Sequence, residues 1–418
     1  GYEQKGLDYP IGFVRWTENR NFQAILNSLE KGNLNVNRLI TEILDFSDFE
    51  KVYNNINNNN SIATIFKYTD DKKTSNTIEL NVTKSINNNL NLKNGNQIAV
   101  IGSGNFTQAR VIPSLNKLKA NVKYVMSASG LSSTISAVKL EAKFSTTDLD
   151  KILKDDEVKN VIITTRHNLH APLVKKALKA NKNVFVEKPL AINKNELKDL
   201  ILVNEKSQGH IIVGFNRRYS KHSIKAKSIL GNNPSEMVVT ATMNAGYIPS
   251  DSWVQDMEVG GGRIIGEACH LIDLISYFVG SSIKSVSMQA LGSNPKTYTD
   301  SGSIHLKYKN GSLGVINYLS NGHKSYPKER IEIFYQGKNI IIDNFQKTYA
   351  YGFGNFFKFG NTILKTKQDK GHHEQFKRLL NSWVTNSDPI LSFEDIINTT
   401  KASFAAIDSL LEKNEIIL

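Results

Sequence analysis

The feature that most constrains the fold of this chain is a run of β-branched residues that ends in a glycine turn. Residues 97–113 read Gln-Ile-Ala-Val-Ile-Gly-Ser-Gly-Asn-Phe-Thr-Gln-Ala-Arg-Val-Ile-Pro. This pattern predicts a strand, a tight turn at Gly102 and Gly104, and then a helix. The predicted buried side of that helix consists of Phe106, Ala109, Val111 and Leu115. Strand, glycine turn and helix follow each other in this order in a dinucleotide-binding unit.

The two glycines would have distinct roles in such a turn. Gly102 would permit the sharp change of direction, and Gly104 would let the backbone approach a pyrophosphate. The free N–H groups and the positive dipole end of the helix would then bind that anion. Thr107 replaces the third glycine of the usual pattern, so helix and strand would pack less closely. A plain left-handed turn explains the two glycines about as well, and the surrounding sequence has to decide.

Length and composition indicate a globular chain of two or three domains. It has 418 residues, a hydrophobic fraction of 40% and a single cysteine, Cys269. One cysteine excludes an intrachain disulfide and a four-cysteine metal site. No apolar stretch approaches the roughly 20 residues of a membrane span, and no signal-peptide pattern opens the chain. We therefore expect a cytoplasmic protein without a membrane partner, whose first residue, a glycine, marks a processing boundary.

The net charge is +13, from 52 Lys and Arg against 39 Asp and Glu. The lysines are spread along predicted helices and are not gathered in one patch. A lysine-rich solvated surface, or attraction of anionic small molecules, explains this distribution better than nucleic-acid binding. We therefore expect no nucleic-acid partner.

Residues 1–70 form one predicted unit with few large apolar side chains. Helices are predicted over 19–29 and 48–56, strands over 36–44 and 61–68, and an Asn-rich run over 54–60. Such a composition makes a poor independent core, so we expect this unit to be part of something larger. Residues 71–95 are rich in Asn, Lys, Thr and Ser, which predicts a linker.

Residues 96–215 alternate apolar strands with helices. Strands are predicted over 122–127, 158–164, 184–186 and 211–215, and helices over 148–154, 172–180 and 194–207. Apolar strands separated by helices are typical of a parallel, doubly wound α/β sheet. The sequence therefore predicts a Rossmann dinucleotide-binding domain over 96–215.

The pattern changes in residues 216–370, which predict a substrate and oligomerisation domain of the α+β class. Its large, mainly antiparallel open sheet has predicted strands over 238–243, 286–291, 303–308, 313–318, 330–335 and 339–343, and one helix covers 263–278. Lys-Asn-Gly-Ser at 309–312 predicts a hairpin turn. Two C-terminal helices, over 371–384 and 393–411 within 371–418, are expected to pack back on the two domains.

Polar residues gather after two of the buried strands. Residues 164–170 read Thr-Thr-Arg-His-Asn-Leu-His, and 187–189 read Glu-Lys-Pro. Ligands in doubly wound sheets bind outside the carboxyl ends of the strands, so these groups would face a cofactor crevice. Asn168 would equally cap a helix, and 187–189 would equally form a surface turn. Position favours a role for Lys188 as a mobile cation against a ribose hydroxyl or a reacting oxygen.

A third cluster opens the predicted helix over 263–278. Three consecutive glycines at 260–262 permit close approach of a ligand or another backbone. His270 suits proton transfer near neutral pH, and Glu267 lies one helical turn before it. The same spacing fits a metal, but two candidate ligands make a poor metal site. A single helical histidine is more often structural, and the company of Lys188 favours catalysis here.

These motifs, in this order, resemble the glucose–fructose oxidoreductase/inositol dehydrogenase (Gfo/Idh/MocA) family over residues 96–418. The motifs are the Gly-Ser-Gly-Asn-Phe turn, Glu-Lys-Pro, Gly-Phe-Asn-Arg-Arg-Tyr at 214–219, and the glycine-led helix with His-Leu-Ile-Asp at 270–273. Arg-Trp-Thr-Glu-Asn-Arg at 15–20 and Asn-Val-Asn-Arg-Leu-Ile-Thr at 35–41 resemble the end of a zinc-dependent medium-chain alcohol dehydrogenase. Residues 1–70 would then be the remnant of a module whose zinc ligands precede residue 1, and we expect no metal.

The resemblance implies hydride transfer between a nicotinamide cofactor and a hydroxyl or carbonyl carbon of a sugar or nucleotide sugar, in surface-polysaccharide metabolism. Lys188 matches the family's lysine beside nicotinamide and substrate, where it would hold the developing oxyanion. His270 matches the proton-transferring histidine. The family's aspartate four residues earlier is Gly266 here, and Glu267 is the candidate substitute, one helical position away. The family also implies a homodimer or homotetramer through the sheet domain.

Gly266 and Thr107 together raise a rival hypothesis, a non-catalytic nucleotide-binding module of a larger bi-domain protein. NAD and NADP both stay open, because the second strand ends Ser-Ala-Ser-Gly at 127–130 with no acid for a ribose and no arginine for a 2′-phosphate. The predicted cofactor-binding residues are Gly102, Gly104, Asn105, Phe106, Thr107, Ser127, Ser129, Thr165, Arg166, His167, His170, Glu187 and Lys188. The predicted substrate-binding residues are Arg217, Tyr219, Asn244, Tyr247, Trp253, Asp256 and His270.

Overall fold

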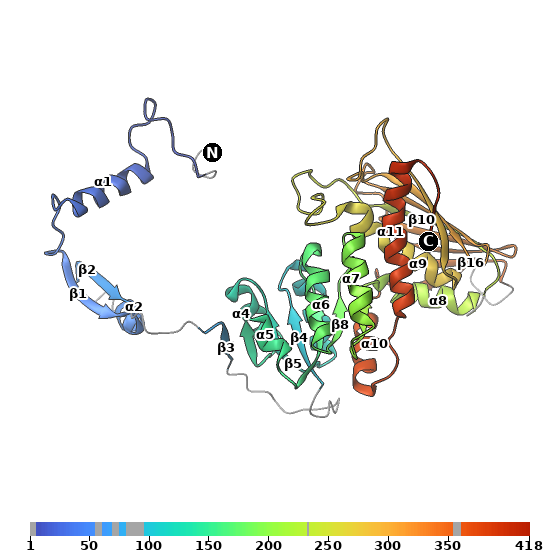
Figure 1. Cartoon of the computed structure of the whole chain (residues 1–418), viewed down its shortest axis with the longest axis horizontal. Coiled ribbons are helices and arrows are strands. Elements are labelled where there is room, and N and C mark those ends of the chain that lie inside the picture. Colours follow the sequence, from blue (N-terminus) through green and yellow to red (C-terminus); the bar gives the residue numbers. More distant parts are fainter. Residues whose placement is uncertain (1–5, 55–60, 69–74, 81–95, 232–233, 354–360) are drawn as a thin grey trace. The chain divides into compact units, whose positions relative to one another are not determined.

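The computed structural model describes residues 6–54, 61–68, 75–80, 96–231, 234–353 and 361–418. The chain divides into two compact units, Gly1–Ser75 and Asn76–Leu418 (Figure 1). The predicted Asn-rich run after Asn54 and most of the predicted linker lie outside the described residues. Across the described ranges, no helix is long and apolar enough to cross a membrane.

The first unit has helices and strands, but its described residues form no hydrophobic core. Its elements are α1 (Glu18–Glu30), β1 (Ile40–Asp45), the 3-10 turn η2 (Phe46–Asp48), α2 (Phe49–Asn54) and β2 (Ala63–Lys67). Thr17 caps α1 by accepting a hydrogen bond from the Arg20 backbone N–H at 3.3 Å. Strands β1 and β2 pair in parallel, yet Thr17 is the one buried residue in the described part of this unit. Parallel sheets are normally covered on both faces, so this unit leaves exposed the surface that such a sheet usually buries.

The prediction that 71–95 is entirely a linker is wrong. Strand β3 (Thr77–Glu79) belongs to the second unit and pairs antiparallel with β6 (Phe144–Thr146). The Thr77 and Thr146 hydroxyls lie 2.8 Å apart and hydrogen-bond to each other. Three residues are too few for a strand periodicity to show in the sequence, and the pairing partner lies far along the chain.

A seven-stranded sheet forms the first half of the second unit and confirms the predicted Rossmann class. The strand order is β3-β6-β5-β4-β7-β8-β9, and all pairs except β3-β6 are parallel. The remaining strands are β4 (Gln97–Ile101), β5 (Val122–Met126), β7 (Val158–Ile163), β8 (Asn183–Val186) and β9 (Ile211–Val213). The helices between them are α3 (Ile112–Lys117), α4 (Gly130–Lys139), α5 (Leu149–Leu153), α6 (His170–Lys179) and α7 (Lys194–Asn204).

Helix α4 and strand β6 were not predicted from the sequence. The helix reads Gly-Leu-Ser-Ser-Thr-Ile-Ser-Ala-Val-Lys, a composition that favours turns and caps over helix interiors. Its serines bond back to the helix: the Ser133 hydroxyl donates to the Gly130 carbonyl at 2.9 Å, and Ser136 to Ser132 at 2.9 Å. The helix is therefore stabilised by its packing against β5 and β6 and not by the intrinsic helix propensity of its residues.

The helix after the glycine turn buries a different side from the one predicted. It begins with a π-helical turn, η3 (Thr107–Val111), before α3. Ala109 is exposed and Phe106 is half-buried, whereas Thr107 and Val111 are fully buried. A π-turn contains one more residue than an α-turn, so residues after it appear at different angles from those that a 3.6-residue period predicts.

A nine-stranded sheet forms the second half of the unit, in the order β17-β16-β15-β14-β10-β13-β12-β11-β18. Its strands are β10 (Val238–Asn244), β11 (Ile283–Ala290), β12 (Gly302–Tyr308), β13 (Leu313–Leu319), β14 (Glu329–Tyr335), β15 (Lys338–Asp343), β16 (Lys347–Tyr351), β17 (Thr362–Lys365) and β18 (Ile416–Ile417). The pair β10-β13 is parallel and all other pairs are antiparallel. The predicted hairpin joins β12 to β13, with the Tyr308 N–H donating to the Ser312 carbonyl at 3.0 Å. This sheet confirms the predicted α+β class.

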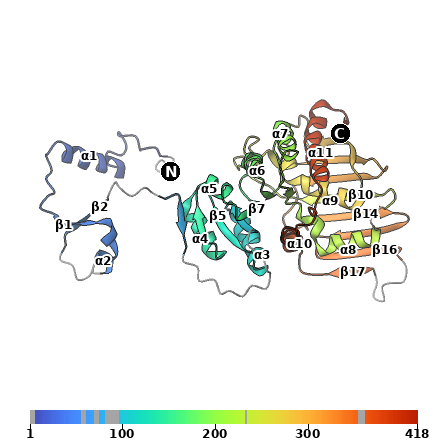
Figure 2. The same cartoon turned by 60° about the horizontal axis from the view of Figure 1, so that its bottom comes forward.

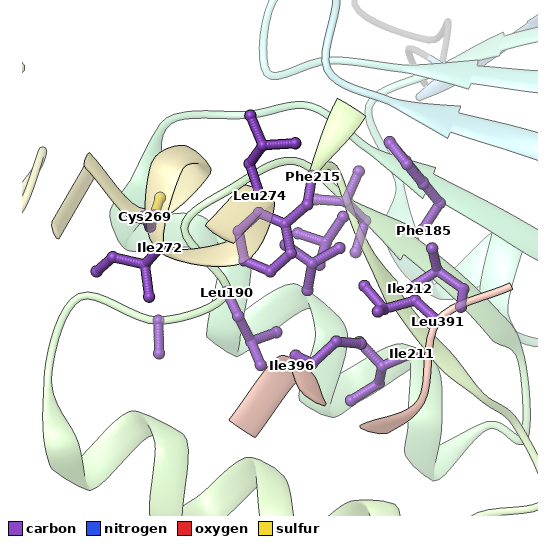
Figure 3. Packing of buried hydrophobic residues seen from close by; sticks show 14 of the residues in the cluster. Phe185, Leu190, Ile211, Ile212, Phe215, Cys269, Ile272, Leu274, Leu391 and Ile396 are labelled. Atoms are coloured by element: carbon purple, nitrogen blue, oxygen red, sulfur yellow. The ribbon is translucent and has the colours of Figure 1, made fainter. Parts of the chain in front are cut away.

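Helices cover one face of the nine-stranded sheet and join it to the Rossmann sheet (Figure 2). They are α8 (Lys221–Leu230), α9 (Cys269–Val279), α10 (His372–Thr385) and α11 (Phe393–Glu412). Helix α11 packs on β11, α9 and α7, and α10 packs on α3. Figure 3 shows part of the shared core, in which Ile211 of β9 lies near Ile396 of α11, and Phe185 of β8 belongs to the same buried cluster. One continuous core therefore carries both sheets of this unit.

Candidate active site

The glycine turn after β4 has the shape that a pyrophosphate requires. Gly102 has a φ of +109°, and a β-carbon there would lie 2.8 Å from the backbone of Thr164. Gly104 is different, because a β-carbon built on it meets no heavy atom within 4 Å. The Ser103 hydroxyl between them is buried and has no hydrogen-bond partner among the described residues. Open space, an unpartnered hydroxyl and the start of a helix fit the phosphates of a dinucleotide.

Thr107 takes the place of the third glycine without loosening the turn. It is fully buried, and its hydroxyl bonds to the Gly102 carbonyl at 3.0 Å and to the Thr164 hydroxyl at 2.7 Å. The hydroxyl thereby fixes the end of β4 to the end of β7. The predicted looser packing at this position is therefore wrong, since hydrogen bonds replace the close glycine contact. Asn105, also predicted to bind cofactor, is exposed beside Gly104.

The end of β5 carries hydroxyls and no charge. The Ser127 hydroxyl lies 2.7 Å from that of Ser132 and also donates to the Ser129 carbonyl. In a Rossmann domain this edge receives the adenosine ribose. Ser127 and Ser129 lie at this edge, where they offer hydroxyl groups without selecting for or against a 2′-phosphate.

The segment after β7 contains two histidines, His167 and His170, whose contacts are structural. His170 is fully buried, with Nδ1 at 2.8 Å from the Pro189 carbonyl and Nε2 at 3.1 Å from the Thr165 carbonyl. Burial lowers the pKa of His170 to about 4, so the ring is neutral near pH 7. A neutral ring carries one N–H, so it donates to one of these two carbonyls and only contacts the other; the buried ring packs between the two polar segments instead of contacting a cofactor as predicted. Thr165 is half-buried next to it, and its hydroxyl donates to the Arg166 carbonyl.

His167 fills space beside Gly266. A β-carbon on Gly266 would lie 3.0 Å from Cε1 of His167. The ring is held by a 2.7 Å hydrogen bond between Nδ1 and the Gly260 carbonyl, and Trp253 packs edge-on against it at 4.9 Å. Arg166 is exposed and its guanidinium lies 5.6 Å from the Trp253 ring centre. His167 therefore contacts the glycine-led helix, a placement that no local sequence signal indicated.

Lys188 connects β8 to the glycine-led helix. Its ammonium donates a 2.7 Å hydrogen bond to the Gly266 carbonyl. Gly266 lies in η6 (Ile264–Ala268), a π-helical turn that leads directly into α9 and His270. The Lys188 ammonium thus contacts the carbonyl of a residue that lies one helical turn before His270. The two residues that the sequence assigned to catalysis therefore both belong to the start of this helix, Lys188 by contact and His270 by position.

His270 is a buried histidine with a ring nitrogen left unpartnered by the described residues. Its side chain is buried, and Nδ1 has no hydrogen-bond partner among the described residues. Burial, followed by the positive charges of Arg217 and Lys188, lowers the pKa of His270 well below its usual value. The ring is therefore a neutral imidazole near pH 7, and because Nδ1 is unpartnered the protein does not fix which nitrogen carries the proton.

Glu187 is a buried acid that supports the loop. Burial raises its pKa to about 7, and one carboxylate oxygen accepts the Lys188 backbone N–H at 3.3 Å. A β-carbon on Gly214 would lie 2.6 Å from the other oxygen, so Glu187 occupies the space above that glycine. This position explains why Gly214 follows β9. It leaves Glu187 as a supporting residue rather than an exposed cofactor ligand.

Glu267 does not replace the missing aspartate. Its carboxylate accepts hydrogen bonds from the Tyr318 hydroxyl at 2.5 Å, from Lys328 at 3.0 Å and from Arg263 at 3.2 Å. Lys328 and Lys188 hold its pKa below the usual range, although burial opposes them. A carboxylate bound to three donors is a poor proton acceptor. The prediction that Glu267 pairs with His270 is therefore not met in this structure.

Two of the predicted substrate residues form structural contacts in the 3-10 turn η5 (Asn216–Tyr219). The Arg217 guanidinium binds buried Glu329 of β14 at 2.5 Å, and Lys370 binds the same carboxylate at 2.6 Å. Tyr219 is buried and its hydroxyl donates to the Ile390 carbonyl at 3.1 Å. Neither side chain is free to bind substrate.

The neighbouring Arg218 was missed by the sequence analysis. It pairs with buried Asp273 of α9 at 2.5 Å. Two buried arginine–carboxylate pairs, those of Arg217 and Arg218, therefore fasten the end of β9 to the second sheet and to α9. The adjacent arginines in the Asn-Arg-Arg-Tyr motif were the available signal.

The other predicted substrate residues lie in different places: two shape loops, one is exposed, and one contacts the candidate site. The Asn244 amide donates to the His323 carbonyl at 2.8 Å, and Asp256 accepts the Glu258 N–H at 2.8 Å, so both shape loops. Tyr247 is exposed. Of this group, Trp253 alone is placed against the site, through its contact with His167.

An open glycine turn in a Rossmann domain, joined to a mainly antiparallel sheet domain, is the arrangement of a two-domain oxidoreductase that uses a nicotinamide cofactor. Residues 96–215 match the oxidoreductase family described as having an NAD-binding Rossmann fold, and residues 236–340 match the Gfo/Idh/MocA C-terminal domain. The chain belongs to the Gfo/Idh/MocA family. Within the described ranges, no group of three or more potential metal ligands is present.

Relatives with assigned names support this placement. Myo-inositol 2-dehydrogenase of Thermotoga maritima is 25% identical over 283 residues, which cover 65% of this chain and 83% of that protein. Oxidoreductase YrbE of Bacillus subtilis is 24% identical over 313 residues, covering 72% and 86%. Levoglucosan dehydrogenase in complex with NADH and levoglucosan shares the fold with a TM-score of 0.67 at 18% identity, covering 77% of this chain and 99% of that one. GenD2 of gentamicin A biosynthesis, in complex with NAD, has a TM-score of 0.63 at 18% identity, covering 78% and 97%.

Proposed function

We propose that this chain transfers hydride between a nicotinamide cofactor and the CH–OH or carbonyl carbon of a sugar or nucleotide sugar. The observation that carries the proposal is the junction of Lys188 and His270. The Lys188 ammonium is held on the Gly266 carbonyl, one turn before an imidazole whose Nδ1 has no partner in the part of the chain that the structure describes. A cation and a neutral base at one helix are the groups that alcohol oxidation requires.

The residues fit a dinucleotide at the glycine turn. Gly104, Ser103 and the first N–H groups of η3 would hold the pyrophosphate, and Ser127 would face the adenosine ribose. The bound nicotinamide supplies the hydride acceptor or donor. Lys188 would hold the substrate oxygen as negative charge develops on it. His270 would remove the hydroxyl proton in oxidation and return it in reduction.

The first experiment is a titration of the 418-residue chain with NADH and with NADPH, followed by nicotinamide fluorescence. Micromolar binding of either is expected, and a panel of sugars, inositols and nucleotide sugars would then be assayed for NAD reduction. Absence of binding to both cofactors would overturn the proposal. Binding without turnover on any substrate would favour the rival hypothesis of a non-catalytic nucleotide-binding module, which Gly266 and the engaged Glu267 motivate.

We also propose that residues 1–70 derive from the C-terminal end of a zinc-dependent medium-chain dehydrogenase. The two motifs quoted above and the parallel pair β1-β2 with its exposed apolar side chains support this origin. Limited proteolysis should remove this unit and leave residues from about 76 onward resistant. Survival of the first unit under conditions that digest loops would contradict it.

Assembly through the outer face of the nine-stranded sheet is part of the same proposal, as is a role in surface-polysaccharide metabolism. Val238, Leu313 and Phe334 are exposed on three neighbouring strands of that sheet, which supports a dimer or tetramer. Light scattering of the purified chain tests it: a monomer at micromolar concentration would refute it. The metabolic role rests on the family resemblance, and activity on nucleotide sugars is its test.

A further inference from the structure

A polar pocket lies between α3 and the start of α10, outside the residues assigned to catalysis. Its volume is about 290 Å³. Arg110 and Lys117 line it from the helix that follows the glycine turn, and Lys370, His372 and His373 line it from the other side. Whole small-molecule sites occupy roughly 300–1,000 Å³, so a pocket of this size would hold part of a ligand.

The charges around this pocket are not balanced by the protein. Among the described residues, Arg110 and Lys117 have no salt bridge and no side-chain hydrogen bond. The one acid in the lining, Asp369, already accepts the Lys221 N–H at 3.1 Å and the Gly371 N–H at 2.9 Å. Two unpaired cations at the mouth of a pocket create a positive potential that favours an anion.

The start of α10 adds to this potential. The helix has 14 residues, and its N-cap, Gly371, has no side chain to bond the N–H groups of the first turn. These groups and the positive dipole end of the helix therefore remain available where His372 and His373 line the pocket. In agreement, burial and then the charge of Arg110 lower the pKa of His372 to about 3.

The pocket lies beside the glycine turn. The His372 ring lies 5.8 Å from that of Phe106, which directly follows the glycine turn. Lys370 binds Glu329, the same buried carboxylate that holds Arg217. The positive charge of Lys370 is also among the causes that lower the pKa of His270. A ligand group in the pocket would therefore lie next to a molecule bound at the glycine turn.

We propose that this pocket binds the phosphoryl group of an anionic sugar substrate, through Arg110, Lys117 and the N-terminus of α10. The inference rests on the proposed function and narrows it, since a neutral sugar or inositol would leave these cations without a partner. Two phosphate sources share this chemistry: a sugar phosphate and the diphosphate of a nucleotide sugar.

The test is calorimetry on the full chain with glucose 1-phosphate, UDP and glucuronate as probes, together with NADH and NADPH titrations. The variant R110E/K117E reverses the pocket charge, R110Q/K117Q removes it, and K176E/K179E on exposed positions of α6 is the control with the same net charge change. We expect one of the two phosphorylated probes to bind wild type and the control alike. We expect R110E/K117E to weaken that binding at least about tenfold and R110Q/K117Q to weaken it less.

The other outcomes each overturn the proposal. No binding of either phosphorylated probe, equal weakening in the control, or equally tight binding of glucuronate would remove the phosphoryl assignment. A loss of NADPH affinity without a loss of NADH affinity would assign the pocket to the cofactor. NADH binding by the same samples keeps this test apart from the proposed function, because failure of the pocket leaves NADH binding intact. Circular dichroism melting confirms that each variant is folded.

Discussion

Two helices of the candidate site begin after glycines, one after Gly102 and the other after Gly262. Different residues fill the crowded position at each of these helix starts. Both begin with a π-helical turn, η3 after Gly102 and η6 after Gly262. At the first start, Thr107 fills the crowded position itself and bonds to Gly102 and Thr164. At the second start, Gly266 is bare, and His167 from the segment after β7 fills the space.

The difference shows which residues fix the conformation of each helix start. The first start is held by residues of its own strand and turn together with Thr164, which follows β7 and bonds to Ile101, Gly102 and Thr107. The second start depends on side chains from distant segments: Lys188 on the Gly266 carbonyl, and His167 against its α-carbon. A change at the second start should therefore affect catalysis through several elements, whereas a change at the first should affect stability and cofactor binding.

The largest effect is expected from Lys188→Met, which keeps the length of the side chain and removes its charge. We expect kcat to fall about 100- to 1,000-fold, because the developing oxyanion loses its cation. The affinity for NADH should change little, and Lys179→Met, at an exposed position of α6, should behave as wild type. Steady-state kinetics on the best substrate measures this, and an unchanged kcat would remove Lys188 from the mechanism.

Gly102→Ala would break the first start. The new β-carbon would lie 2.8 Å from the Thr164 backbone, at a φ of +109°. We expect the free energy of unfolding in urea to fall by about 1–3 kcal/mol. Gly104→Ala is the matched control, since its β-carbon meets open space, and it should keep wild-type stability while binding NADH more weakly. Equal stability of both variants would contradict the description of this turn.

Gly266→Ala would destabilise the second helix start, and we expect a smaller loss of stability than for Gly102→Ala. The contact at 3.0 Å is with the His167 ring, which can shift by a few tenths of an ångström, so we expect a loss of about 1 kcal/mol. The double variant with His167→Ala removes the clash and should recover part of that loss. A double-mutant cycle in urea measures the coupling. Strict additivity of the two changes would show that the residues do not share the space.

The smallest effect concerns acid sensitivity at the second start, where the buried ring of His167 fills the space beside Gly266. Burial lowers the pKa of His167 to about 3, from an ordinary value of 6.5. Below about pH 6.5 the unfolded chain takes up a proton that the folded chain refuses. Stability therefore falls as the pH is lowered from about 6.5 towards 3.

His167→Gln should reduce this slope by up to one proton while keeping a donor for the Gly260 carbonyl. His305→Gln on the exposed side of β12 is the control and should leave the slope unchanged. Urea unfolding at several pH values provides the measurement. A slope equal to that of wild type in His167→Gln would contradict the burial of a neutral His167.

The sequence was sufficient for the features that local patterns encode. The strand–turn–helix at 97–113, the apolar parallel strands and the hairpin at 309–312 follow from periodicity and turn chemistry, and the structure confirms them. Lys188 and His270 were predicted as catalytic residues from their positions at a strand end and on a glycine-led helix, and their roles stay a prediction. Helix α4 was missed because its serines have low helix propensity, and β3 because three residues carry no period.

The sequence was insufficient wherever a side chain has a distant partner. Arg217, Tyr219 and Glu267 have the chemistry of ligand-binding residues, but Glu329, Ile390 and a trio of donors occupy them in the fold. No local pattern reveals such partners. The contact of His167 with Gly266 is of the same kind, since the two residues are about a hundred positions apart in sequence and meet only after both sheets have formed.

The hydroxyl-lined end of β5 has a consequence for metabolism. An enzyme with an acid at this edge is committed to one coenzyme by electrostatic repulsion of the other. Ser127 and Ser129 exert no such repulsion. The direction of flux through a site of this kind would follow the reduced fraction of whichever coenzyme pool the cell maintains. A single Ser127→Asp exchange would then couple the reaction to the NAD pool alone.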